Sequence, residues 1–312
     1  MSTIIITGGA GFIGHHLVRA LAPSHTLVVV DDLSSGHAAR LPAGVELIKA
    51  DCGTPSLWPE LLTKAEAVIH LAAIASVPVC EREWLRAHKT NIGATVALME
   101  AVGHAQRAHQ KKIPFIYASS AAVYGVNNDG RLSEDRMVKP FSAYGADKYA
   151  CELHAAVGAR NHNITSVGLR FFNVFGAGQD PSSPYSGVIS IFMARLKQQQ
   201  PLTIFGDGTA ARDYIPVEKI VEGIMASLAL ARAQPEAQSH VFNLCTGQAT
   251  TAKELADMLS TISGQNSAID FAPPRAGDVP RSVGDPSAMA SVLGVNPAID
   301  LRAALSALWK TV

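Results

Sequence analysis

A glycine-rich segment near the amino terminus constrains the fold more than any other feature of the sequence. Residues 7–14 read TGGAGFIG. They follow the β-branched run at 4–6 and precede apolar positions at 17–21, whose spacing suits a helix packed on a sheet. A bare glycine pattern is weak evidence, but strand, glycine turn and helix together are the context in which such glycines indicate a dinucleotide site.

Three of the four glycines of this segment have separate tasks in such a site. Gly8 permits the tight turn, Gly11 lets the backbone approach a pyrophosphate, and Gly14 lets the helix pack closely on the strand. The phosphates are expected to lie on the unpaired N–H groups at the positive end of the helix, beside Phe12 and Ile13.

An acidic pair follows the next apolar run and completes this pattern. Residues 27–30 read LVVV and end in Asp31 and Asp32. A carboxylate about 20 residues past the glycines accepts the ribose 2′-hydroxyl of a dinucleotide and repels a 2′-phosphate. Asp also suits solvated turns, but the order of strand, glycines, helix, strand and acid favours a cofactor site. We therefore expect NAD rather than NADP.

Composition excludes several classes of protein. The chain has 312 residues, of which 48% are hydrophobic, and this is enough for a sizeable core in one or two domains. The formal net charge is zero, and no basic stripe indicates nucleic-acid binding. No apolar run is long enough to span a bilayer. Because the chain enters a strand at once, we expect no signal peptide and a cytoplasmic location.

Cysteine and histidine usage indicates neither disulfides nor a metal site. The four cysteines lie far apart, without a paired or metal-ligand spacing: Cys52, Cys80, Cys151 and Cys245. They are typical of a reduced cytosolic protein. The histidines show no metal-binding pattern, and His15 and His16 are expected on a helix surface.

Strands alternate with helices over the first 170 residues. Strands are expected at 27–30, 45–51, 67–73, 114–120 and 165–170, and helices at 83–108 and 143–159. Asn91 is poor for helix propensity inside the first of these helices, which indicates a polar contact. The alternation predicts an α/β fold with a doubly wound parallel sheet of Rossmann type. Functional residues are then expected beyond the carboxyl ends of the strands.

The local residue composition changes at about residue 175, where a loop rich in Gly, Pro and Ser begins. We expect residues 1–174 to form an NAD-binding domain with return segments near 216–245. Residues 175–312 are expected to form a smaller, interleaved α/β domain that makes a cleft over the cofactor and binds substrate. Thr251 and Glu254 form a capping-box pattern at the start of a helix in this half.

Tyr144 and Lys148 place a phenol and an ammonium group four residues apart, on one face of a helix. A free tyrosine titrates near pH 10 and is a poor base at neutral pH. A nearby cation favours the phenolate, as does the positive nicotinamide ring of bound NAD. The pair therefore supplies a base for a sugar hydroxyl while hydride leaves its carbon. Taken alone, such a pair is more often a half-buried Tyr beside a surface Lys, an arrangement common on any helix.

The chain resembles the extended short-chain dehydrogenase/reductases and, within them, nucleotide-sugar C4 epimerases of the UDP-glucose 4-epimerase type. The resemblance covers nearly the whole length. It rests on residues 7–14, Asp31, and residues 70–73, 119–125, 144–148, 170–176, 206–214 and 275–278. No single motif is specific, but the set is.

The resemblance implies roles for individual residues. Ser120 hydrogen-bonds the substrate's O4 beside Tyr144, and Lys148 holds the nicotinamide ribose. Besides the glycine turn, Tyr144 and Lys148, the implied NAD site comprises Asp31, Asp32, Ser34, Ser35, Gly36, Asp51, Cys52, Leu71, Ala72, Ala73, Asn91, Ser119 and Phe171. Besides Ser120 and Tyr144, the implied nucleotide-sugar site comprises Asn173, Val188, Thr203, Phe205, Arg212, Arg275, Asp278 and Ser282.

Within that sugar site, Asn173, Arg212 and Arg275 are expected at the diphosphate and Phe205 near the uracil. Arginine suits phosphate because its planar fork matches the oxygens and stays charged. The alternative for the two arginines is a surface ion pair.

Two positions narrow the reaction and the substrate. Related dehydratases and decarboxylases carry acidic residues just after the position of Ser120, whereas this chain has Ala121 and Ala122, which cannot transfer protons. The resemblance therefore implies C4 inversion through a transient 4-keto sugar. Ser282 falls at the family's gating position beside the hexose, where a small residue leaves room for a 2-acetamido group. UDP-hexoses and UDP-N-acetylhexosamines are both candidate substrates.

Two alternative functions remain open. An ADP-heptose 6-epimerase has a similar strand end after Ser120 but usually takes NADP, which Asp31 disfavours. A catalytically silent NAD-binding protein has no chemical reason to keep Ser120, Tyr144 and Lys148. The resemblance also implies a homodimer packed through residues 85–108 and 143–160. Two positions depart from relatives: Pro216, and Ala75, where some epimerases have a Lys near the cofactor phosphates.

Overall fold

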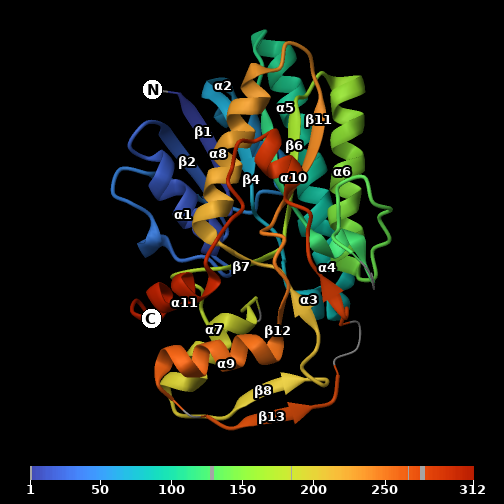
Figure 1. Cartoon of the computed structure of the whole chain (residues 1–312). Coiled ribbons are helices and arrows are strands. Elements are labelled where there is room, and N and C mark those ends of the chain that lie inside the picture. Colours follow the sequence, from blue (N-terminus) through green and yellow to red (C-terminus); the bar gives the residue numbers. More distant parts are fainter. Residues whose placement is uncertain (1, 127–129, 184, 266, 275–277) are drawn as a thin grey trace.

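Seven parallel strands form the centre of the protein in a computed structural model, which describes residues 2–126, 130–183, 185–265, 267–274 and 278–312 (Figure 1). Their order is β11-β6-β5-β4-β1-β2-β3, so the strand order reverses between β1 and β4. The strands are β1 (Thr3–Thr7), β2 (Thr26–Asp31), β3 (Glu46–Lys49), β4 (Ala65–His70), β5 (Phe115–Ser120), β6 (Ser166–Phe171) and β11 (Ser239–Leu244). This confirms the predicted α/β, doubly wound sheet, and ligands bind such sheets where the order reverses.

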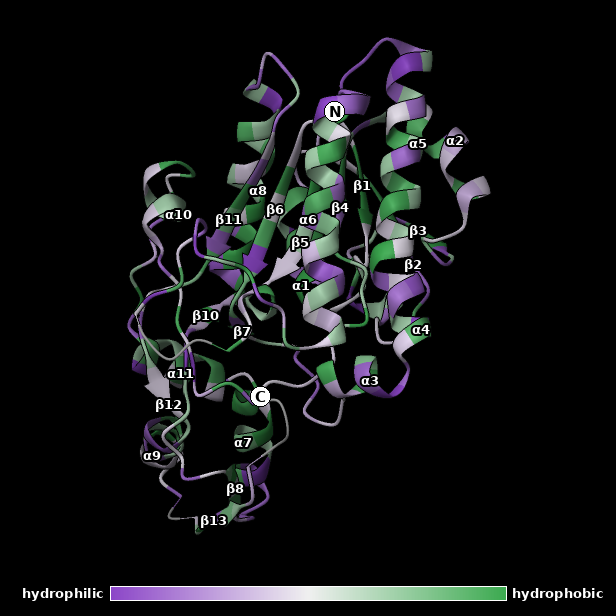
Figure 2. Ribbon diagram, turned by 90° about the vertical axis from the view of Figure 1, so that its right-hand side faces the viewer, coloured by the Kyte–Doolittle hydropathy of each residue, from purple (hydrophilic) through white to green (hydrophobic). Residues whose placement is uncertain are grey.

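Both faces of the sheet are covered by helices (Figures 1 and 2). Helices α1 (Phe12–Leu21) and α8 (Val217–Ala233) lie on one face with Ile4 and Ile6 in their core. Helices α2 (Trp58–Lys64), α5 (Ala94–His109) and α6 (Ala143–His162) lie on the other with Ile5. Successive side chains of a strand point to opposite faces, so an unbroken apolar run such as that of β1 belongs to a strand buried on both sides.

The helix predicted over 83–108 is interrupted in the structure, which corrects that prediction. It consists of α4 (Trp84–His88), a π-helical turn η3 (Lys89–Gly93) and α5, and a short helix α3 (Val77–Arg82) precedes it. Asn91 lies in the π-helical turn and is fully buried. Such turns occur mostly as local insertions in α-helices, frequently at functional sites.

The second half of the chain adds a smaller lobe beyond the carboxyl ends of the sheet strands (Figure 1). Its helices are α7 (Val188–Lys197), α9 (Ala252–Ser263) and α11 (Leu301–Trp309), which share one apolar core. Its strands are β7 (Asn173–Phe175), β8 (Leu202–Phe205), β9 (Ala211–Arg212), β10 (Tyr214–Pro216), β12 (Thr250–Thr251), β13 (Ile269–Ala272) and β14 (Arg281–Ser282). The predicted capping box of Thr251 and Glu254 opens α9.

The remaining short elements connect these parts. They are η1 (Ala38–Arg40), η2 (Pro55–Leu57), η4 (Ala121–Tyr124) and α10 (Ser287–Ser291). Strand β11 pairs with β6 along its length, so the chain returns from the smaller lobe to the main sheet as expected. Pro216 ends β10, where it pairs with Phe175, and directly precedes α8. Within the described residues no helix has the length and apolar character that crossing a membrane requires.

Candidate active site

One large cavity lies between the ends of the sheet strands and the smaller lobe. Its volume is about 1680 Å³, larger than the roughly 300–1,000 Å³ typical of a site for one small molecule. The cavity wall contains Gly11 of the glycine turn, Tyr144 of α6 and Arg212 of the smaller lobe. The cavity therefore has room for a dinucleotide and a second ligand side by side.

The glycine turn fits a dinucleotide because it leaves backbone where side chains would otherwise be. Gly8 has φ +68°, and a Cβ there would lie 2.6 Å from the backbone nitrogen of Ala72. A Cβ on Gly14 would lie 2.6 Å from the Cα of Gly9. Helix α1 begins after Gly11 with no acidic residue in its first turn and no side-chain cap. Its first N–H groups are thus left for an anion.

Asp31 has a structural task that the sequence reasoning missed. One carboxylate oxygen accepts a hydrogen bond from the backbone N–H of Ala10, and the other accepts from that of Leu33, both at 2.9 Å. Burial raises the pKa of Asp31, and these two donors oppose that shift. The carboxylate thus fastens the glycine turn to the end of β2 while still lining the cavity. Asp32 is exposed and accepts from the backbone and hydroxyl of Ser34.

Strand β5 and helix α6 bring Ser120, Tyr144 and Lys148 together. Ser120 lies close enough to Tyr144 that its side chain lowers the pKa of the phenol, and both side chains line the cavity. The Nζ of Lys148 lies 5.9 Å from the centre of the Tyr144 ring and donates to the carbonyl of Ala118 at 2.9 Å. Ser142 caps α6 by accepting from the N–H of Gly145, which fixes the first turn that carries Tyr144.

The pKa of Tyr144 differs from the expectation that the nearby cation Lys148 would lower it. Burial raises the pKa of Tyr144 to about 12, although the neighbouring Ser120 side chain opposes the rise. Burial also lowers the pKa of Lys148. The Lys148 ammonium alone therefore does not make Tyr144 a phenolate at neutral pH. A base at this position needs the additional positive charge that a bound oxidised nicotinamide supplies.

A buried hydrogen-bond chain supports the wall behind these residues. Thr95 donates to the carbonyl of Asn91 at 2.6 Å, so its oxygen accepts from Nε2–H of His70 at 3.0 Å. Nδ1 of His70 then accepts from the hydroxyl of Thr7 at 2.7 Å. The chain joins β1, β4 and the π-helical turn, and sequence reasoning assigned no role to Thr7 or Thr95.

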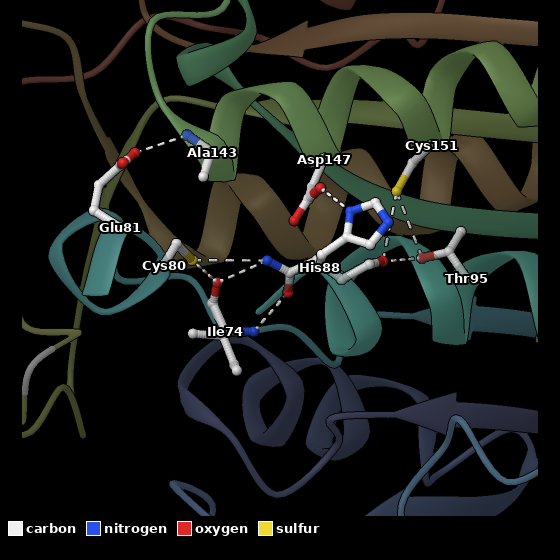
Figure 3. A network of polar contacts seen from close by, with 9 residues as sticks. Ile74, Cys80, Glu81, His88, Thr95, Ala143, Asp147 and Cys151 are labelled. Carbon is white, nitrogen blue, oxygen red and sulfur yellow. Dashed lines mark hydrogen bonds and ion pairs between the residues drawn. The ribbon is translucent and has the colours of Figure 1, made fainter. Parts of the chain in front are cut away.

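The amide of Asn91 holds the loop after β4 in place. Its Oδ1 accepts from the N–H of Ile74 at 2.8 Å, and its Nδ2 donates to the carbonyl of the same residue at 3.2 Å. Cys80 also donates to that carbonyl, and Cys151 of α6 donates to Thr95 (Figure 3). The predicted polar contact of Asn91 is confirmed. Because Asn91 is fully buried, it shapes the cavity from behind and is absent from the lining.

His70 is expected to contribute to acid sensitivity of the fold. Burial lowers its pKa from 6.5 to about 3. The unfolded state therefore binds one more proton between these pH values, and the free energy of unfolding falls as pH falls through this window. The slope is at most about 1.4 kcal/mol per pH unit.

Urea unfolding at a series of pH values should show a shallower dependence of the free energy of unfolding on pH for His70→Gln than for the parent. An unchanged profile would contradict this, and His104→Gln, exposed on α5, is the matched control.

Most of the predicted cofactor residues lie on the wall of the same cavity. These are Gly8, Gly11, Phe12, Ile13, Gly14, Asp31, Asp32, Ser34, Ser35, Asp51, Cys52, Leu71, Ala72, Ala73, Ser119, Tyr144, Lys148 and Phe171. Gly36 is outside the lining but packs against Asp31, since a Cβ there would lie 2.9 Å from its Oδ1.

The predicted substrate residues divide into two groups. Ser120, Tyr144, Asn173, Val188, Arg212, Asp278 and Ser282 line the cavity. Thr203 and Phe205 do not: Thr203 accepts a hydrogen bond from Arg195, and Phe205 is exposed on β8. Arg212 is paired with the carboxylate of Asp278. Arg275 lies outside the described residues.

Two buried acids that sequence reasoning did not single out hold the substrate side together. Asp213 is fully buried and accepts from the backbone N–H groups of Thr246, Gly247 and Gly284, which places Arg212 and Ser282 on adjacent strands. Glu152 accepts from both nitrogens of the Arg170 fork, at 2.9 and 2.7 Å, and from the hydroxyl of Ser119 at 2.6 Å. Buried Asp and Glu are rare unless paired, but a sequence does not reveal which are buried.

His15 and His16 also differ from expectation. His15 is buried, not on a helix surface, and burial lowers its pKa to about 4. Its Nδ1 donates to the carbonyl of Gly11, and Nε2 of His16 donates to the carbonyl of Ala177 in the loop after β7. No group of three or more potential metal-ligating side chains occurs in the described parts of the chain.

A glycine turn, an acid after the second strand and a Ser-Tyr-Lys set on one cavity define a dinucleotide-dependent enzyme that acts on a hydroxyl-bearing carbon. Residues 4–245 match the model of the NAD dependent epimerase/dehydratase family. The chain belongs to this family, which confirms the predicted resemblance and NAD as cofactor.

Individual relatives are similar along their whole length. A UDP-glucose 4-epimerase of Mycolicibacterium smegmatis is 34% identical, covering 95% of this chain and 94% of that protein. The structure of a UDP-glucose 4-epimerase from Thermotoga maritima with UDP-glucose superposes with TM-score 0.91 at 33% identity, over 99% and 98% of the two chains. A UDP-N-acetylglucosamine 4-epimerase from Methanobrevibacter ruminantium, in complex with UDP-N-acetylmuramic acid, reaches the same TM-score at 32% identity, over 99% and 97%.

Proposed function

We propose that this protein is an NAD-dependent 4-epimerase of UDP-sugars, which interconverts UDP-glucose with UDP-galactose, or UDP-GlcNAc with UDP-GalNAc, through a transient 4-keto sugar. The observation that carries the proposal is that Ser120, Tyr144 and Lys148 line one cavity together with the glycine turn and Arg212. The names of the similar proteins support the same reaction and a uridine nucleotide.

The residues of this chain divide the chemistry between them. The cofactor, when bound, supplies the acceptor for the C4 hydride and the source from which it returns. Ser120 positions the O4 hydroxyl, and Tyr144 takes its proton as the hydride leaves C4. Tyr144 later gives the proton back when hydride returns to the opposite face of the rotated sugar. Ala121 and Ala122, next to Ser120 on the cavity wall, offer no acid or base for elimination or decarboxylation.

The division of labour between the two halves of the chain is part of the proposal. Residues 1–174, with return segments near 216–245, bind NAD, and residues 175–312 bind the nucleotide sugar. Arg212 holds the substrate diphosphate after exchanging Asp278 for phosphate oxygens, and Arg275 assists. Asn173 and Val188 complete this side of the site. The positions of Thr203 and Phe205 outside the cavity give no support for direct contact with the nucleotide.

NMR analysis of products from a panel of UDP-, TDP- and ADP-sugars tests the proposal. We expect a C4 epimer from UDP-sugars. Inversion at C6 of an ADP-heptose would favour the heptose epimerase, and absence of turnover with NAD bound would favour a silent NAD-binding protein.

We propose further that Ser282 admits N-acetylhexosamines. Its small side chain lines the cavity wall next to Arg212 and is 9% exposed. Ser282→Tyr is expected to lower kcat/KM for UDP-GlcNAc by about tenfold or more while kcat/KM for UDP-glucose stays within about threefold, because the ring occupies the space of the acetamido group. Ser282→Ala is the control and should keep both substrates. Activity of the parent on the plain hexose alone, or equal losses for both sugars, would contradict this role.

The proposed assembly is a homodimer in the cytoplasm. Leu85 on α4 and Leu153 and Val157 on α6 expose apolar side chains, as expected if these helices pack against a second copy. The four cysteines are free and buried, in keeping with a reducing compartment. Sedimentation velocity measures the oligomeric state.

A further inference from the structure

The cavity needs positive charge to bind anionic ligands, and the side chains of the glycine turn supply none. In the proposed function it holds two anionic diphosphates, one of NAD and one of the UDP-sugar. The turn offers backbone N–H groups and the residues Gly8, Gly11, Phe12, Ile13 and Gly14, none of them cationic.

The cations of the described cavity wall lie elsewhere. They are Arg40, Arg82, Arg86, Lys89, Lys148 and Arg212. Lys148 donates to the carbonyl of Ala118, and Arg212 is paired with Asp278. The hydrogen bonds from Ser182 lower the pKa of Asp180, and the positive charge of Arg40 lowers it further, which places Arg40 near that carboxylate. Of the other three, Arg82 lies on α3, Arg86 on α4 and Lys89 on the π-helical turn η3.

The loop at 176–187 extends along the cavity from the glycine turn to these helices. At its first end the carbonyl of Ala177 accepts from His16 of α1, and Gly178 lies against the His15 ring. At its other end Tyr185 packs on an apolar cluster beside α3 and α4 that includes Val79 and Ala87, and Tyr144 packs on the same cluster. Tyr185 also lines the cavity. The loop therefore places a phenol on the cavity wall beside α3 and α4.

Arg86 on α4 lies within electrostatic range of this phenol. Burial raises the pKa of Tyr185, and the positive charge of Arg86 opposes that rise. The charge of Asp32, at the ribose end of the predicted dinucleotide site, also acts on Arg86. The Arg86 guanidinium is paired with Glu83 of the preceding turn, and its side chain is 61% exposed. An exposed ion pair of this kind is weak, so Arg86 can exchange Glu83 for a phosphate.

We propose that Arg86 and Tyr185 form the second half of the cofactor diphosphate site, where helices α3 and α4 meet the loop at 176–187, and that they retain NAD between turnovers. The guanidinium donates charge-assisted hydrogen bonds to phosphate oxygens, and the phenol donates one more. This proposal rests on the proposed function, because a 4-epimerase regenerates its NAD in each cycle and gains from never releasing it.

The test measures release of bound NAD, a readout that does not require turnover. Protein loaded with NAD is diluted into a scavenging dehydrogenase, and the appearance of free NAD gives the dissociation rate. Arg86→Met is expected to release NAD about tenfold faster than the parent, which corresponds to about 1.4 kcal/mol. Tyr185→Phe should release it about threefold faster. Arg86→Lys should recover part of the loss, since it keeps the charge but not the fork.

Glu83 supplies a second and opposite prediction. Glu83→Gln frees Arg86 and is expected to slow NAD release about threefold, and this effect should vanish when Arg86 is already Met, as a double-mutant cycle would show. Arg82→Met is the matched control, since Arg82 pairs with the same carboxylate, and it should release NAD at the parental rate.

The proposal would be overturned if Arg86→Met released NAD at the parental rate. It would also be overturned if Arg82→Met and Arg86→Met accelerated NAD release equally, because that result would indicate only a general effect of positive charge at the cavity. Failure of the proposed function itself has a different signature: NAD is retained normally, but no UDP-sugar is epimerised.

Discussion

Tyr144→Phe is expected to lower kcat by about a hundredfold or more while NAD stays bound. General acid–base catalysis by a positioned side chain typically contributes about 10²–10⁴-fold, and Tyr144 is the phenol whose pKa the Ser120 side chain affects at the cavity wall. Because burial raises the pKa of Tyr144 to about 12, the parent should also gain activity as pH rises until the pKa of the loaded enzyme is passed. Steady-state kinetics over a pH series measures both effects.

The control for this substitution lies on the same helix. Tyr149→Phe also removes a hydroxyl from α6, but Tyr149 packs with the cluster around Val123 and Leu132 and is absent from the cavity wall. It should keep near-parental kcat. Near-normal epimerisation by Tyr144→Phe would show that Tyr144 is not the base. Equal losses in the two variants would point to damage to α6 instead.

Gly14→Ala is expected to leave the purified protein without NAD. A Cβ at this position would lie 2.6 Å from the Cα of Gly9 and even closer to the carbonyl oxygen of Gly8, both of which are backbone atoms that cannot rotate away. Helix α1 must then move off β1, and the N–H groups at its start leave the phosphate position. Overpacking of this kind typically costs about 1–3 kcal/mol of stability, so thermal unfolding should also shift downward.

Gly158→Ala on α6 is the matched control for Gly14→Ala. Its new Cβ would meet the Ile164 side chain at 3.8 Å, an ordinary contact, and alanine favours a helix over glycine. This variant should bind NAD normally and be at least as stable as the parent. Full NAD content in Gly14→Ala would show that the turn does not require glycine there.

The fold was predictable where one residue pattern admits one arrangement. The Ile4 to Ile6 run, the glycines and Asp31 determine strand, turn, helix and strand in order, and β1 is buried on both faces as expected. The break in the helix near Asn91 was not predictable in kind. Propensity indicated a polar contact of Asn91, which lies in the π-helical turn. Its partner Ile74 is distant in sequence and comes beside it only in the folded chain.

The site was predictable as a set of residues but not in its electrostatics. The sequence identified Ser120, Tyr144 and Lys148, yet the expectation that Lys148 lowers the pKa of Tyr144 neglected burial, which has the larger effect and raises it. Likewise the carboxylate of Asp31 was assigned to a ribose, although it also holds the N–H of Ala10. Both omissions have one cause: local spacing reports which groups are near, whereas burial and contacts distant in sequence depend on the packing of the whole chain.

The most direct test of the account uses UDP-glucose that carries deuterium at C4, followed by NMR of the product in ordinary water. If Tyr144 and the cofactor site act as described, UDP-galactose forms with deuterium retained at C4, because the hydride leaves and returns without meeting solvent, and no NADH is released. Absence of the C4 epimer, or an epimer whose C4 deuterium has been lost to solvent, would contradict the account.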